Sequence, residues 1–427
     1  MDNGIAARTR GKLSFVDLVE WFILFAFLLP RGYIEYSQTY KLFSQLCTWA
    51  AVGLALAVVI MYADRVFRRV SSSALAVALY FVLAAVITLF SREVDGGGLQ
   101  QLFAYPVLCL YVVFAMRTRP AHFLLTVDLL CLLLFGANLL VGRSFFAGIL
   151  HMSLLGHVQM YAQLGIVSLY AAACYWMLYR RHRLLLLFQT VLTLYTLLTA
   201  DADSAVLTAA LLFLFGLFYL LRLYDFLLLP SAFYLFCGLL LSATVIYVTA
   251  VAPSIGARLG LSDLNGRRFI WEEALRLFRA RPLFGYGIDG VKIRVFWSVY
   301  TDPNGFNYAH AQLMQNLLDG GIVLTVAFWG MLCAFCRRMD RVQAKRYRAA
   351  TNAMLTALMI VSAFDAFTIY CYGFLFFAMV MGMPHAIGET DDVRDRRGTL
   401  LRVVRRAACP PQARKAREKE RRPFGWA

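Results

Sequence analysis

The sequence is poor in charged residues, which make up 16% of its 427 residues, whereas 61% are hydrophobic. Soluble globular domains carry about 25% charged residues. Together with a mean hydropathy of +0.65, this shortage excludes an ordinary soluble domain and is typical of a polytopic membrane protein. Acidic residues are scarce as well, 25 against 42 Lys and Arg. The net charge of +17 does not predict nucleic-acid binding, because the arginines stand in short clusters between apolar runs.

The chain also lacks a cysteine framework, since eight of its nine cysteines fall in apolar runs. No spacing of Cys and His predicts a disulfide scaffold or a metal site, and we predict no metal and no cofactor. The N-terminal segment MDNGIAARTRGKLSF is basic and leads into an apolar run without a small-residue cleavage site. We therefore expect a retained first membrane span rather than a removed signal peptide.

Long apolar runs are what the sequence has in abundance. A helical span needs about 20 apolar residues, and the candidates are 15–31, 43–62, 73–90, 99–116, 121–141, 158–179, 184–200, 205–221, 226–251, 311–336, 349–369 and 372–388. With a cytoplasmic N-terminus, the short inner loops hold fifteen Lys and Arg and the short outer loops hold four, as the positive-inside rule requires. We predict an all-α, polytopic membrane protein with about twelve transmembrane helices and both termini in the cytoplasm.

This topology divides the chain into four parts. A membrane domain with spans one to nine covers 1–251, and a long extracytoplasmic loop covers 252–309. A second membrane domain with spans ten to twelve covers 310–388, and a basic cytoplasmic tail covers 389–427. The long loop carries eight Lys and Arg against five acidic residues. Because this excess opposes the positive-inside rule, it predicts an anionic partner on the outer face.

Within that loop, the stretch GRRFIWEEALRLFRARPLFGYG (266–287) holds five arginines in 22 residues. Ile270, Ala274 and Leu277 recur at helical spacing and predict an amphipathic helix. Pro282 ends it, and the following Gly-Tyr-Gly turn redirects the chain. These arginines could simply contact lipid headgroups. Alternatively they form a phosphate clamp, because the planar guanidinium matches phosphate oxygens with two parallel hydrogen bonds.

A histidine follows the arginine-rich helix, in the stretch NYAHAQLMQNLLDGGI. His310 lies at the outer end of the tenth predicted span, where a structural histidine is common. It could also share an outer cavity with the arginines. There a histidine can accept a proton from a sugar hydroxyl or donate a hydrogen bond to a leaving phosphate.

These two segments resemble the signature of the O-antigen ligase and O-antigen polymerase superfamily. The resemblance is carried, in order and spacing, by Arg267, Trp271, Pro282, Leu283, Gly285, Gly287, His310 and Gly321. Upstream, SLLGHVQMYAQLGIVSLY is similar to the family's G-x-x-x-N-x-x-A segment around Gly156, His157 and Gln159. The resemblance implies a GT-C-like, metal-independent inverting glycosyltransferase of the bacterial cytoplasmic (inner) membrane. Its active site would face outward and assemble surface polysaccharide.

The resemblance also implies substrates and site residues. The donor would be a glycan linked to polyprenyl diphosphate, and the acceptor a glycan or a lipid. Other expected partners are membrane lipids, a flippase and a chain-length regulator. Carried over to this chain, Arg267 or Arg268 would hold the diphosphate and His310 would act as acid or base. The candidate substrate-binding residues are Trp271, Arg276, Arg281, Gly285, Gly287, His157 and Gln159.

Two departures from the family pattern bear on this assignment. Ala311 follows the histidine where Asn, Ser or Gln is usual, and TADADSAVL lacks the Ser-Arg pair of many members. Either a second phosphate ligand then comes from elsewhere, with Arg143, Arg276, Arg281 and Arg294 as candidates, or the substrate differs. The missing pair favours a repeat-unit polymerase over a ligase, which stays the alternative.

A transporter or flippase is the alternative of another class. The acidic residues Glu20, Asp128 and Asp365 lie within the predicted membrane domains and would suit it. However, no internal repeat and no pair of broken helices supports it. A scaffold without catalytic function would leave the outer arginines and His310 without a purpose.

Overall fold

The computed structural model describes residues 15–34, 36–63, 72–91, 96–141, 152–261, 264, 266–294, 296–297, 300–301 and 308–387. The predicted basic tail, 389–427, and the first residues of the chain lie outside them. The helices are α1 (Phe15–Phe27), α2 (Gln38–Met61), α4 (Ser72–Phe90), α5 (Gly96–Thr118), α6 (Pro120–Val141), α7 (Met160–Tyr179), α8 (Arg183–Leu198), α9 (Asp203–Leu220), α10 (Ser231–Ile246), α11 (Pro253–Arg258), α12 (Arg267–Ala280), α13 (Gln312–Asp340) and α14 (Lys345–Ser362).

Shorter elements connect these helices. A last apolar helix covers Cys371–Ile387. The 3₁₀ turns are η1 (Gly32–Ile34) and η3 (Tyr224–Leu227), and η4 (Tyr247–Val251) is a π-helical extension of α10. Two short antiparallel hairpins pair β1 (Met152–Ser153) with β2 (Gly156–His157) and β3 (Phe296–Trp297) with β4 (Tyr300–Thr301).

The predicted helical membrane protein is supported by the apolar character of these helices. In the described part of the chain, eight helices are long and apolar enough to cross a membrane, and each of the twelve predicted spans overlaps a helix. The remaining four, α1, α8, α14 and Cys371–Ile387, are shorter or more charged. The count of twelve and the positions of the termini therefore stay predictions.

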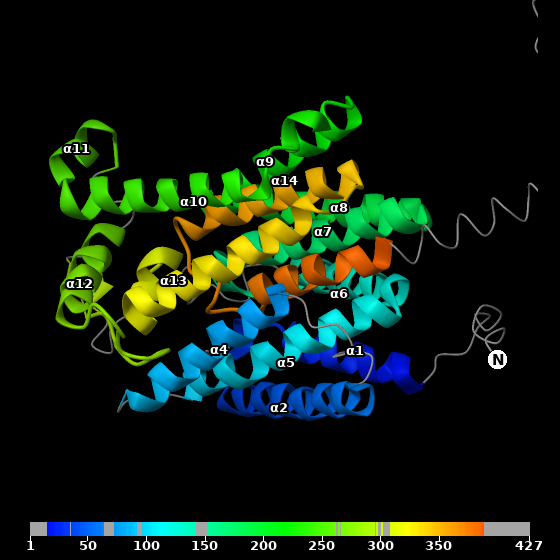
Figure 1. Cartoon of the computed structure of the whole chain (residues 1–427), viewed down its shortest axis with the longest axis horizontal. Coiled ribbons are helices and arrows are strands. Elements are labelled where there is room, and N and C mark those ends of the chain that lie inside the picture. Colours follow the sequence, from blue (N-terminus) through cyan, green and yellow to red (C-terminus); the bar gives the residue numbers. More distant parts are fainter. Residues whose placement is uncertain are drawn as a thin grey trace, which may run out of the picture.

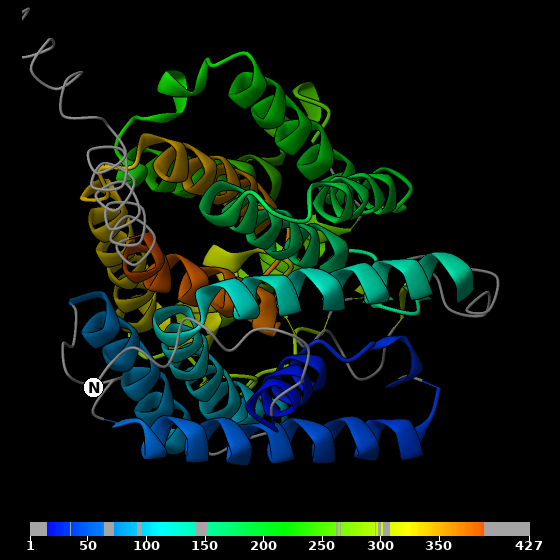
Figure 2. The same cartoon turned by 90° about the vertical axis from the view of Figure 1, so that its right-hand side faces the viewer.

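The helices form one bundle with α7 at its centre and large apolar side chains on its outside. α2 and α9 lie at opposite edges of the bundle, and both carry exposed leucines and phenylalanines (Figures 1 and 2). By contrast, 83% of the apolar window of α7 is buried. An apolar exterior suits lipid, where the polar backbone must be satisfied within each helix. α11 and α12 lie together at one end of the bundle (Figure 1).

The arginine-rich helix forms as the sequence predicts. α12 begins directly after Gly266, ends at Ala280 and is followed by Pro282. Its apolar stripe is buried at Ile270, Trp271 and Ala274. This stripe packs on α13 and η4, so the helix docks on neighbouring helices at the end of the bundle.

The tenth predicted span is not the continuous helix that its apolar run predicts. α13 breaks at Gly320 and Gly321, which have non-helical dihedrals, and Gly321 has φ +58° and ψ −154°. The turn after α12 fills this break with backbone hydrogen bonds. The N–H of Ile322 donates to the carbonyl of Pro282 over 2.9 Å, and the N–H groups of residues 286 and 287 donate to the carbonyls of residues 318 and 319. The break thus ties α12 to α13 in a fixed position.

Candidate active site

Trp271 joins α12 to the segment that carries His310. Its indole ring is fully buried, and its Nε1–H donates a 2.8 Å hydrogen bond to the carbonyl of Ala309. The N–H of Ala309 donates to Oε1 of Gln315 over 2.9 Å, and the Gln315 amide in turn donates to Asp319 over 2.8 Å. Both backbone groups of Ala309 are therefore fixed, one from α12 and one from α13.

This fixed segment holds His310 in an unusual backbone conformation. His310 has φ +49°, in the left-handed region that few non-glycine residues occupy. Such a conformation costs about 1–3 kcal/mol and persists only where the surroundings enforce it. The hydrogen bonds on either side of Ala309 provide that enforcement. They direct the imidazole towards the ring of Tyr308, whose centroid lies 4.1 Å from that of His310.

The electrostatic surroundings of His310 favour the neutral imidazole. Burial, the positive charge of Arg267 and the neighbouring His157 lower the pKa of His310 to about 3. At neutral pH the ring is therefore uncharged, and a neutral imidazole can accept a proton. A dianionic ligand beside it would raise this pKa again, because negative charge stabilises the imidazolium.

Arg267 lies beside this histidine at the first turn of α12. Its Nη1 donates to the carbonyl of Leu264 over 3.2 Å, while its Nε is buried without a hydrogen-bond partner among the described residues. Burial lowers the pKa of Arg267, and Asp365, Tyr308 and Asp203 partly offset this effect. Within the described residues no carboxylate forms an ion pair with Arg267. Its guanidinium is thus a buried cation with capacity for an anionic ligand.

The segment 363–370, between α14 and the last helix, forms another wall of the site. Asp365 is fully buried and accepts hydrogen bonds from Nε2 of Gln163 over 2.8 Å and from the N–H of Ala366 over 2.9 Å. Its charge also acts on Arg267. Gln312 fixes the segment to α13, because its side chain exchanges hydrogen bonds with Thr368 over 2.9 and 3.0 Å.

The second predicted motif reaches the same place from α7. His157 ends the β1–β2 hairpin, and it is one of the groups that lower the pKa of His310. Gln159 precedes α7, and its Oε1 accepts a 3.2 Å hydrogen bond from the hydroxyl of Tyr308. We term this group of residues the Arg267–His310 site: Arg267, His310, Tyr308, His157, Gln159 and Asp365.

A further arginine, Arg31, lies next to this site, although no feature of the sequence singles it out. The guanidinium of Arg31 lies 5.5 Å from the ring centroid of Tyr370. Tyr370 in turn interacts with Tyr308 and Asp365 of the site. The N–H of Arg31 donates to the carbonyl of Leu155 in the β1–β2 hairpin over 3.1 Å. No local motif marks Arg31, because only packing between distant segments brings it here.

The other arginines of the predicted clamp face elsewhere. Arg268 donates to Glu272 over 2.8 Å on the outer face of α12. Arg276 is exposed and contacts Glu273 through two hydrogen bonds of 2.6 and 2.7 Å. Arg281 lies over the ring of Tyr286, 4.7 Å from its centroid. Arg143 lies outside the described residues.

The predicted glycines pack against backbone and side chains of the bundle. Gly285 has φ +58°, and a β-carbon there would lie 2.3 Å from the carbonyl oxygen of Leu318. Gly287 has φ +88°, and its β-carbon would lie 2.3 Å from Oγ of Ser91 in the connection after α4. Both positions require glycine for the turn that fills the break in α13.

Metal ligands do not cluster in the described part of the chain. No group of three or more His, Cys, Asp and Glu side chains there is arranged to hold a metal ion.

Comparison with known proteins points to one family. A family model described as O-Antigen ligase matches residues 188–329. The matched segment runs from α8 into α13 and includes Arg267, Arg268, Trp271 and His310. No curated protein matches the chain.

Proposed function

We propose that this chain, a member of the O-antigen ligase and polymerase superfamily of surface-polysaccharide assembly proteins, is a membrane glycosyltransferase that polymerises glycan repeat units. The donor is a glycan on polyprenyl diphosphate, and the acceptor is a sugar hydroxyl of another repeat unit at the outer face of the cytoplasmic membrane. The observation that carries the proposal is a buried arginine, Arg267, beside a neutral histidine, His310.

The reaction needs stabilisation of negative charge on the leaving group. The acceptor oxygen attacks the anomeric carbon, the bond from that carbon to the diphosphate oxygen breaks, and its electron pair goes to the diphosphate. Attack from the face opposite the leaving group inverts the anomeric configuration. Preorganised cations in a site that excludes water are the largest source of such stabilisation. Arg267 supplies one cation, and Arg31 supplies the second one that the missing Ser-Arg pair would otherwise provide.

The reaction also releases the proton of the acceptor hydroxyl. His310 accepts it in this proposal, because its ring is neutral before the donor binds and becomes more basic once a diphosphate lies nearby. Tyr308 and Gln159 orient the ring and line the acceptor side. Asp365 keeps Arg267 in place without forming an ion pair that would compete with the phosphate. Charge stabilisation comes from arginines, so the proposed mechanism is independent of a metal.

Transfer to a lipid core or another acceptor is the second candidate function, because the matching family model is described as O-Antigen ligase. The preference for a polymerase rests on the segment TADADSAVL. There Asp203 begins α9 and acts on Arg267 in place of a second arginine.

A reconstituted assay separates these functions. Purified protein in liposomes receives a synthetic polyprenyl-diphosphate-linked repeat unit, with or without a lipid-core acceptor, and the products are resolved by size. A ladder of polymers without the second acceptor supports a polymerase, and transfer only in its presence supports a ligase. An absence of both products, with correctly folded protein, contradicts the proposed glycosyltransferase.

A further inference from the structure

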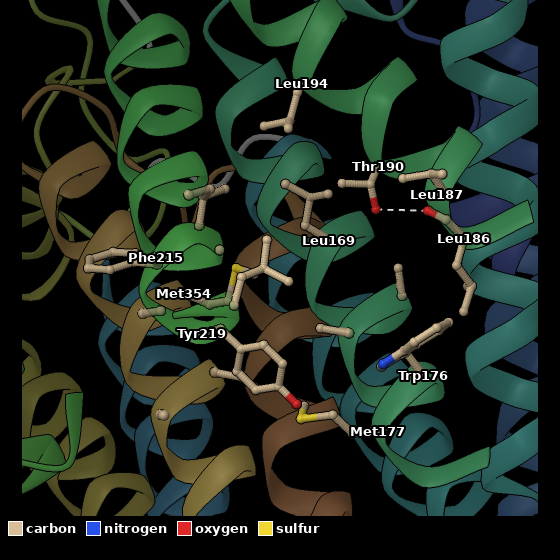
Figure 3. Close-up of a pocket in the computed structure, with 18 of the residues that line it drawn as sticks. Leu169, Trp176, Met177, Leu186, Leu187, Thr190, Leu194, Phe215, Tyr219 and Met354 are labelled. Atoms are coloured by element: carbon tan, nitrogen blue, oxygen red, sulfur yellow. Dashed lines mark hydrogen bonds between the residues drawn. The ribbon is translucent and has the colours of Figure 1, made fainter. Parts of the chain in front are cut away.

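A cavity lies between α7, α8, α9 and α14, away from the Arg267–His310 site. Its volume is about 500 Å³. The helix ends nearest to it are the C-terminus of α7 and the N-termini of α8 and α14, whereas the site lies at the N-terminus of α7. Figure 3 shows its walls, with Leu169 and Trp176 from α7, Leu187 and Leu194 from α8, and Phe215 from α9. The cavity and the site therefore lie at opposite ends of α7.

The walls of this cavity are almost entirely hydrocarbon. The hydroxyl of Thr190 is already engaged, because it donates a 2.8 Å hydrogen bond to the carbonyl of Leu186 (Figure 3). Alanines 172, 173, 349, 350 and 353 leave the space that larger side chains would fill. A large apolar cavity does not hold ordered water well, since water needs several polar partners. Its chemistry suits a hydrocarbon chain.

Positive charge gathers at one end of this cavity. Arg183, at the first position of α8, lines the cavity, and its guanidinium lies 5.2 Å from the ring centroid of Trp176. Stacking on an indole face leaves the edge of the guanidinium available for hydrogen bonds. Arg180 and Arg181 are exposed in the adjoining loop.

Two acidic residues at this end of the bundle, Asp225 and Asp340, have partners of their own. Asp225 lies 3.5 Å from Nζ of Lys345. Asp340 accepts hydrogen bonds from the N–H and the hydroxyl of Ser231 over 2.9 and 2.8 Å. The opening of the cavity is therefore positively charged, in contrast to its apolar interior.

We propose that this cavity binds an anionic phospholipid of the surrounding leaflet, with one acyl chain between the helices and the headgroup phosphate on Arg183. Basic pockets between transmembrane helices are known to bind anionic headgroups on the cytoplasmic side, which is where the predicted topology places this loop. The charge at the opening selects an anionic lipid over a zwitterionic one. The bound acyl chain fills the space beside α7, the helix whose other end reaches Gln159.

Trp176 offers a direct probe, because it lines the cavity. Purified protein is placed in vesicles that contain phosphatidylglycerol or phosphatidylcholine with brominated acyl chains, which quench nearby tryptophans. Subtracting the signal of Trp176→Phe isolates the contribution of Trp176. We expect brominated phosphatidylglycerol to quench Trp176 at roughly fivefold lower mole fraction than brominated phosphatidylcholine, the contribution of about one surface cation.

Two arginine variants test the role of the charge. Arg183→Gln is expected to abolish the preference for phosphatidylglycerol without unfolding the protein, because Arg183 is exposed. Arg337→Gln is the matched control, an exposed arginine in the last turn of α13 that does not line the cavity. It should keep the preference.

Several outcomes would overturn the proposal. Equal quenching by the two lipids, no quenching of Trp176, or an unchanged preference in Arg183→Gln would each do so. Displacement of brominated phosphatidylglycerol by polyprenyl phosphate at a lower mole fraction would assign the cavity to the polyprenyl chain instead. None of these results depends on transferase activity.

Discussion

Replacing Trp271 with phenylalanine should impair catalysis more than folding. The indole Nε1–H holds the carbonyl of Ala309 at 2.8 Å, and the adjacent His310 has φ +49°. Phenylalanine keeps most of the buried apolar surface but removes this donor. The Ala309 carbonyl then stays buried without its partner, so the segment gains by moving to an ordinary extended conformation that carries the imidazole away from Arg267.

The size of the effect follows from two opposing costs. A buried carbonyl that loses its donor costs about 1–3 kcal/mol, and the left-handed conformation of His310 costs about the same. Losing the hydrogen bond therefore removes most of what enforces the conformation. A shift of about 1–3 kcal/mol in the population of the competent conformation corresponds to a decrease of roughly 5- to 150-fold in kcat. The KM for the donor should change little, because Arg267 keeps its own place on α12.

The assay is transfer by reconstituted protein at matched amounts, with thermal unfolding measured in parallel. Trp329→Phe is the matched control, because Trp329 is a partly buried residue of α13 whose buried Nε1–H has no hydrogen-bond partner among the described residues. This control should keep wild-type kcat. A Trp271→Phe variant with wild-type kcat would refute the proposed positioning of His310. An equal loss in Trp329→Phe would show that any tryptophan replacement disturbs the bundle.

Three further changes test other parts of the site. Asp365→Asn removes the negative charge that acts on the buried Arg267, so we expect a lower kcat/KM for transfer; a wild-type kcat/KM would disprove this role of Asp365. Gly321→Ala places a β-carbon 2.4 Å from the backbone of Leu283 at φ +58°, so we expect a loss of about 1–3 kcal/mol in stability or more, seen as a lower Tm. Arg276→Ala removes only an exposed contact with Glu273, and its activity should stay within about twofold of wild type; a large loss would bring Arg276 into the site.

The sequence anticipates features that depend on local patterns. The helix of residues 267–280 follows from its apolar stripe, and its end follows from Pro282. Burial of Trp271 on the neighbouring helices follows from the same stripe. The apolar stripe does not show which of the adjacent arginines enters the site, because consecutive residues on a helix point in directions about 100° apart. Only the packing of α12 shows that Arg267 faces His310 while Arg268 faces Glu272.

Features that depend on contacts between distant segments cannot be predicted from local sequence patterns. The run 311–336 is apolar throughout, and its break at Gly320 and Gly321 forms where the turn 282–287 supplies replacement hydrogen bonds. The site position of Arg31 likewise depends on the hairpin of residues 152–157 and on Tyr370. A short outer loop with one arginine resembles any other in sequence, so this cation is found only from the packed structure.

In the proposed mechanism Arg267 binds the leaving diphosphate, and a comparison with the adjacent Arg268 separates this role from a general effect of positive charge on α12. Initial transfer rates are measured for Arg267→Ala and Arg268→Ala in liposomes at equal amounts of folded protein. Removing one donor that stabilises developing negative charge typically costs about 100- to 1,000-fold in kcat, and we predict that loss for Arg267→Ala. Arg268→Ala breaks only a half-exposed ion pair with Glu272, so it should stay within about threefold of wild type. Equal losses in the two variants, or a greater loss in Arg268→Ala, would contradict the proposed role of Arg267.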